Sequence, residues 1–151
     1  NGDWYAYFGR DTGPRIEGHA LFIKRNAYLM LSPAKMAMGG GADINESLGD
    51  CGDVCAYVAG SADVGLALNT SPVKLAGTST ISVEAGGCYD DSCAGVDGNV
   101  TAYGELPGPV ARYGFSIDLP CPVPDVGVTL KVLPSPGVSS NLDWCDLNPL
   151  W

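Results

Sequence analysis

Cysteines have the clearest chemistry in this sequence. There are six, arranged as Cys51 and Cys55, Cys88 and Cys93, and Cys121 and Cys145. An even number of cysteines in a short chain is typical of a disulfide framework, although six cysteines allow about fifteen connectivities. The spacing favours two local bridges that close Gly- and Asp-rich turns, and one longer bridge between Cys121 and Cys145. Zinc is disfavoured, because a structural zinc site uses closely paired ligands such as C-x2-C.

Three tripeptides have the N-glycosylation pattern, and their asparagines are Asn45, Asn69 and Asn99. Together with the cysteines they predict a secreted or cell-surface protein that is processed in an oxidising compartment. We expect Asn69 and Asn99 in polar turns beside strands, and Asn45 in a helical turn. A chain that begins at Asn1 without an initiator methionine is interpreted as one whose signal peptide has been removed.

The remaining chemical side chains form no recognisable reactive constellation. Asp90, Asp91, Asp97 and Asn99 offer enough oxygen atoms for calcium, but their spacing does not match a calcium-binding loop, so we expect solvated turns. The one histidine, His19, lies in no pattern that would supply a general base or a nucleophile. The sequence therefore predicts no cofactor, no metal and no enzymatic activity.

The net charge of −9 and the pI near 4.2 argue against nucleic acid as a partner. The charge is unevenly distributed: residues 1–35 contain five bases and three acids, and the remainder contains three bases and fourteen acids. No apolar stretch approaches the roughly 20 residues of a transmembrane helix, so we expect no membrane span. The acidic surface also disfavours anionic membranes.

Glycines and prolines, 21 and 11 in number, interrupt the chain too often for long helices. Residues alternate between apolar and small or polar in 64–69, 112–119 and 126–132, which predicts strands with one buried face. Weaker strand candidates are 4–8, 20–24, 27–31, 56–59, 73–76, 78–85 and 99–105. The sequence predicts an all-β domain: a disulfide-stapled antiparallel β-sandwich, or a barrel, of about eight to ten short strands.

Two short peripheral helices are expected between these strands. Ser32 and Pro33 resemble a helix start before residues 34–38, and the glycines 39–41 would end that helix. Asp43 could cap a second helix over residues 44–48, with Glu46 in the capping-box position.

Both ends of the chain are rich in aromatic and apolar side chains, which is unusual for termini. The interpretation is that residues 1–15 form a strand-like arm with a hinge, and that residues 16–151 form a single domain. The expected subunit interface consists of Trp4, Tyr5, Ala6, Tyr7, Phe8, Trp144, Leu150 and Trp151.

These features lead to a functional hypothesis based on strand addition. The N-terminal arm of one copy would complete the sheet of the next copy, giving a head-to-tail filament or surface layer of a non-enzymatic structural subunit. One alternative is a carbohydrate-binding module with stacking platforms at Trp4, Tyr89, Tyr103 or Trp144. Another is a secreted inhibitor or effector that presents the loop between Cys88 and Cys93.

Overall fold

The computed structural model describes residues 4, 6–9, 16–20, 22–50, 53–90, 92–120 and 123–144, with the backbone alone for His19 and Ala20. These residues form ten β-strands, which are β1 (Ala6–Phe8), β2 (Ile16–Ala20), β3 (Ile23–Leu31), β4 (Lys35–Asp50), β5 (Val54–Thr70), β6 (Val73–Tyr89), β7 (Ser92–Leu106), β8 (Val110–Asp118), β9 (Asp125–Leu133) and β10 (Gly137–Asp143). The described residues contain no helix that is long and apolar enough to cross a membrane.

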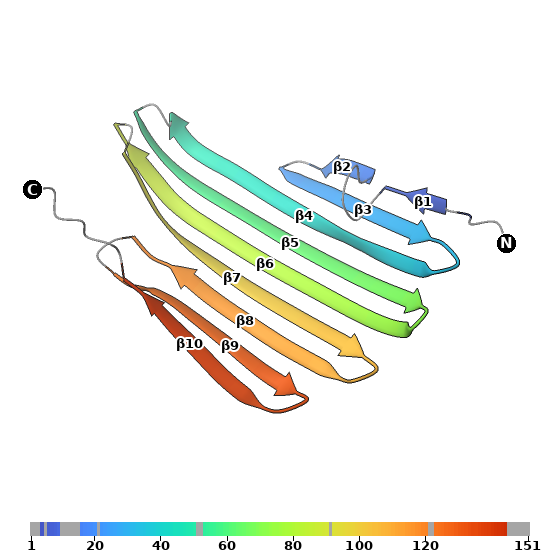
Figure 1. Ribbon diagram of the computed structural model, residues 1–151. Helices are drawn as coiled ribbons and strands as arrows, with labels where there is room; N and C mark the ends of the chain where they lie inside the picture. The colour runs from blue at the N-terminus through green and yellow to red at the C-terminus, as the bar shows by residue number, and fades with distance from the viewer. Residues whose placement is uncertain are drawn as a thin grey trace, which may run out of the picture.

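The strands form one antiparallel sheet, a meander in which each strand from β3 to β10 pairs with the next in sequence (Figure 1). Both β1 and β2 pair with the outer edge of β3. The all-β, antiparallel prediction is confirmed. The expected sandwich or barrel is not seen in the described residues, which form a single open layer.

Alternation along the strands gives the sheet two chemically different faces. Because directly paired residues point to the same side, the register assigns every strand position to one face or the other. One face, here called the apolar face, contains Val64 of β5, Ile81 of β6, Val100 of β7 and Phe115 of β8. The other, here called the polar face, contains every charged residue of β5–β10, which are Asp63, Lys74, Glu84, Asp97, Glu105, Arg112, Asp118, Asp125, Lys131 and Asp143.

Neither face is covered by a second layer, so the described residues form almost no hydrophobic core. Ala37 and Cys55 are the only apolar residues in this part of the chain that are buried. Large apolar side chains such as Leu66, Ile81 and Val138 are exposed instead. Hydrogen bonds between strands, rather than burial between layers, hold the described part of the chain together.

Both predicted helices are wrong, because residues 35–50 form one long strand, β4. The Ser32 hydroxyl accepts a hydrogen bond from the Lys35 N–H at 2.9 Å, so it caps a turn between two strands instead of a helix. The three glycines are needed for close approach. A Cβ on Gly39 would lie 2.5 Å from the Val64 carbonyl oxygen, and one on Gly41 would lie 2.8 Å from that of Ala62.

The two ends of the sheet also differ. At one end, here called the proline end, short turns with Pro33, Pro72, Pro107 and Pro134 connect the strands. The Thr70 hydroxyl donates a 2.8 Å hydrogen bond to the Pro33 carbonyl and joins two of these turns. At the opposite end, here called the cysteine end, lie Cys55, Cys88 and Cys93, and strands β4–β7 extend beyond β8–β10 (Figure 1).

Candidate functional site

A row of five carboxylates crosses the polar face on five adjacent strands. It consists of Glu84, Asp97, Asp118, Asp125 and Asp143, here called the carboxylate row. Glu84 is paired with Asp97, Asp97 with Asp118, and Asp125 with Asp143. Asp118 follows Ile117 and Asp125 precedes Val126, so both lie next to the pair Ile117–Val126. Like charges directly opposite each other destabilise a sheet. This row therefore brings several unfavourable pairs of like charges together on one face.

Hydrogen bonds relieve part of this repulsion. The Asp118 carboxyl is hydrogen-bonded to Asp97 and raises the pKa of Asp97, an effect to which desolvation and the charges of Asp118, Glu84 and Asp125 add. The Leu119 N–H donates to the Asp125 carboxylate at 2.8 Å, and the Asn141 amide donates to Asp143 at 3.1 Å. These hydrogen bonds lie at the level where β8 and β10 end and β9 begins.

Tyrosines lie across glycines on the same face. The ring of Tyr28 on β3 lies over Gly39 of β4, and its hydroxyl lies beside Gly65 of β5. Tyr57 on β5 repeats this arrangement over glycines of β6 and β7, and its hydrogen bond with Glu84 raises the pKa of the tyrosine. Each tyrosine therefore packs on two neighbouring strands, which gives the polar face its own packing without a second layer.

Nearer the proline end the polar face carries basic groups. Lys74 forms a 2.9 Å ion pair with Glu105, and Glu105 also accepts a hydrogen bond from the Tyr103 hydroxyl. Arg112 and Lys131 are directly paired on β8 and β9. Lys74, Arg112 and Lys131 therefore lie nearer the proline end than the carboxylate row does, with Glu105 among them.

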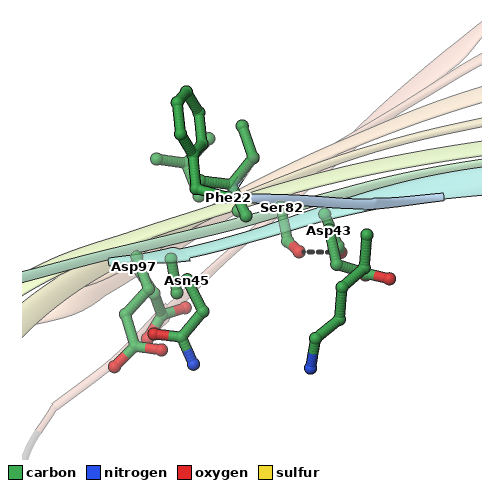
Figure 2. A pocket seen from close by; sticks show the side chains of 12 residues that line it. Phe22, Asp43, Asn45, Ser82 and Asp97 are labelled. Carbon is green, nitrogen blue, oxygen red and sulfur yellow. Dashed lines mark hydrogen bonds between the residues drawn. The ribbon is translucent and has the colours of Figure 1, made fainter. Parts of the chain in front are cut away.

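Figure 2 shows a hollow near the carboxylate row, viewed along the sheet. Phe22 lies on one side of the sheet, whereas Asp43, Asn45, Ser82 and Asp97 lie on the other. Because its lining comes from both faces, the hollow is no enclosed ligand pocket. No group of three or more His, Cys, Asp or Glu residues within the described ranges is placed to hold a metal ion.

The N-terminal residues of the expected interface lie at one edge of the sheet. Ala6, Tyr7 and Phe8 form β1, which pairs with Leu29–Leu31 of the same chain. Trp4 is 55% exposed and Trp144 is 72% exposed. The remaining interface candidates, Tyr5, Leu150 and Trp151, and most of the expected hinge lie outside the described residues.

The predicted Cys88–Cys93 bridge is present, with an S–S distance of 2.05 Å across the β6–β7 hairpin. Cys55 is also disulfide-bonded. Cys51, Cys121 and Cys145 lie outside the described residues. The structure contains no free cysteine in its described ranges.

All three sequon asparagines lie on the polar face. Asn45 belongs to β4 and not to a helical turn, Asn69 is near the end of β5, and Asn99 lies within β7 between Ser82 and Ser116. The expected turn location is therefore wrong for both Asn69 and Asn99. Glycan attachment at these positions stays a prediction.

The aromatic residues considered as sugar platforms do not share a surface. Tyr89 lies on the apolar face at the cysteine end, whereas Tyr103 lies on the polar face and is hydrogen-bonded to Glu105. These two tyrosines cannot stack on one sugar chain together.

Comparison with protein-family models, with curated proteins and with solved structures finds no match for this chain. The function must therefore be argued from the sheet itself.

The carboxylate row predicts a pH-dependent stability. Folding raises the pKa of the Asp97 carboxyl. The stability that this group contributes is therefore fully present below its pKa in the unfolded chain, and it is lost as the pH rises through its pKa in the folded chain. We expect the melting temperature to rise when the pH is lowered from 7 towards that pKa. Asp97→Asn should raise the melting temperature at pH 7 and flatten the profile.

Asp43→Asn is the matched control for this experiment. Asp43 lies on the same face but is directly paired with Lys24, so its neutralisation removes a favourable neighbour. We expect no gain in melting temperature from it. Equal gains from both variants would show that total charge, and not the row, determines the effect.

Proposed function

We propose that the chain is a non-enzymatic structural subunit at the cell surface, and that the sheet of one copy continues edge to edge into the next. The observation that carries this proposal is the open outer edge of β10. All seven residues of β10 are exposed, and among the described residues its backbone is paired on one side only. Unpaired strand edges add further strands unless something blocks them.

The two edges of the sheet are protected to different degrees. Strand β10 contains no proline and no lysine, the residues that commonly block an edge. At the other edge, β1 and β2 have only three and five residues. This asymmetry supports a head-to-tail contact, in which β10 accepts the N-terminal edge of a neighbouring copy.

Strand direction defines the contact further. Through the unbroken series of antiparallel pairs, β1, β2 and β10 all run in the same direction. A neighbour that keeps the apolar faces and the cysteine ends aligned would therefore add a parallel strand to β10. Such contacts pair every strand edge except the two outermost edges of the assembly.

Two adjacent proline substitutions test the edge. Successive backbone N–H groups of a strand point to opposite sides, so one of Ser139→Pro and Ser140→Pro removes a donor of the open edge and the other a bond to β9. The variant that loses the open-edge donor should give single chains with an unchanged melting temperature. The variant that loses the bond to β9 should have a lower melting temperature. Light scattering gives the mass. The proposal fails if both variants assemble like the unmodified chain.

A further inference from the structure

The apolar face is the largest feature of the sheet that strand addition leaves unexplained. On β5–β10 it has no charged residue, and its exposed side chains include Val64, Leu66, Ile81, Val100 and Phe115. Exposed apolar patches larger than a few hundred Å² are rare on soluble monomers and mark interaction surfaces. Edge-to-edge addition enlarges this surface and covers none of it.

We propose that this face lies against lipid hydrocarbon, between the level of the carboxylate row and the proline end. This region, here called the apolar band, runs on β6 from Val73 to Val83. At roughly 3.3 Å per residue this is about 36 Å. A membrane-embedded strand needs about 9–11 residues to cross a hydrocarbon core of about 30 Å when it is tilted.

The boundaries of the band agree with this assignment. On the cysteine side it ends where the carboxylate row begins, and the row coincides with the ends of β8–β10 at Asp118, Asp125 and Asp143. Strands β4–β7 continue past this level, and there the apolar face carries the charges of Glu46 and Asp50. The extension is therefore suited to water, and the row lies outside the band.

Arg25 is the one charged residue within the band among the described strands. It is directly paired with Ala42, two pairs away from the Ile23–Ile44 pair next to the carboxylate row. A long arginine side chain at this depth can extend its guanidinium group to the lipid headgroups. Phe22, which is exposed at the β2–β3 turn, lies close to the same level.

A second copy packed face to face is the other way to cover the apolar face. Strands of water-soluble sheets usually have roughly 3–10 residues. Strands β5 and β6 have 17 each. The polar face, with its carboxylate row and its tyrosines packed on glycine, is suited to water and needs no further layer. Strand length and the segregation of charge therefore favour lipid over a second sheet.

The inference rests on the proposed function in one respect. An unpaired strand edge is very unfavourable in hydrocarbon, so β10 and the N-terminal edge must be paired there by further strands. It departs from the expectation of no membrane span, which considered only continuous apolar stretches. In an alternating strand the apolar residues are never continuous.

Two lysine substitutions near the middle of the band, one on each face, test the assignment. Val64, 61% exposed, lies on the apolar face and is paired with Ser79, and Thr80 lies on the polar face opposite Asp63. The full chain is refolded with phosphatidylcholine vesicles and separated by flotation. The unmodified chain and Thr80→Lys should float, whereas Val64→Lys should lower the vesicle partition coefficient by about 30-fold or more.

Three results would overturn the proposal: an unmodified chain that stays in solution, equal partition of both lysine variants, or a soluble dimer that Val64→Lys dissociates. The last result would assign the face to a second copy. The mass of the detergent-solubilised complex, with and without the β10 prolines, reports separately on edge pairing. Loss of flotation with an intact complex contradicts the lipid contact alone, and flotation of single chains contradicts edge pairing alone.

Discussion

Replacing Gly39 with alanine is expected to lower the free energy of unfolding by about 2–3 kcal/mol, near the upper end of what overpacking usually costs. The new Cβ would lie 2.5 Å from the Val64 carbonyl oxygen and 2.6 Å from the Tyr28 ring. The carbonyl belongs to the backbone of β5 and cannot move without disturbing its pairing with β4 and β6. Chemical denaturation followed by circular dichroism measures the effect.

Gly137→Ala is the control for Gly39→Ala, because a Cβ at Gly137 meets nothing within 4 Å. It should leave the stability unchanged or raise it slightly. A second site tests the tyrosine contact by rescue. A Cβ on Gly95 would lie 2.7 Å from the Tyr57 hydroxyl, so Gly95→Ala should cost less when Tyr57→Phe removes that oxygen. Equal costs in both backgrounds would show that the tyrosine does not need the glycine.

Replacing Trp4 with alanine should weaken the association of subunits by at least about 100-fold, since truncation of a buried tryptophan costs about 3–5 kcal/mol. Trp4 is mostly exposed in the single chain, and it has the parity of Ala6 and Phe8, which lie on the apolar face. On the same face, the open edge strand β10 offers two exposed apolar residues, Val138 and Leu142. The dissociation constant, measured by sedimentation, gives the result.

Trp4→Phe keeps an aromatic ring and should retain most of the affinity. The melting temperature of the single chain should be the same for Trp4→Ala as for the unmodified protein. A lower melting temperature of the single chain would contradict the prediction, because it would show that Trp4 packs on its own sheet. So would unchanged association.

Alternation of residue type predicted the fold class and most of the strands. Residues 64–69, 112–119 and 126–132 lie in or largely in β5, β8 and β9. The candidates 73–76 and 78–85 are parts of a single strand, β6, because Gly77 does not interrupt it. The candidate 20–24 instead contains the turn between β2 and β3, and β10 was not expected at all.

The errors have a common physical origin. Glycine was interpreted as an interruption, but Gly39 and Gly86 continue their strands and leave room for tyrosine rings. Local capping patterns around Ser32 and Asp43 then suggested helices in a segment that pairs with β3 and β5 over its whole length. Long-range pairing overrode these local preferences.

The carboxylate row could not be read from the sequence, because its members are brought together only by the register of five strands. A weaker signal was available. From residue 54 onwards every charged strand residue falls on the same parity of its strand, with Glu84, Asp97 and Asp118 as examples. This regularity predicts one face without charge. An uncharged face was expected to be buried in a protein core.

The meander has a kinetic consequence. Each strand from β4 to β10 pairs only with its sequence neighbours, so the contacts of the sheet are mostly local. Local contacts close small loops and favour rapid folding. Since the described residues form no second layer that couples distant strands, the sheet is close to a one-dimensional array, in which hairpins can form anywhere and extend in both directions. Opening should begin at the two edges and reach the central strands β5 and β6 last.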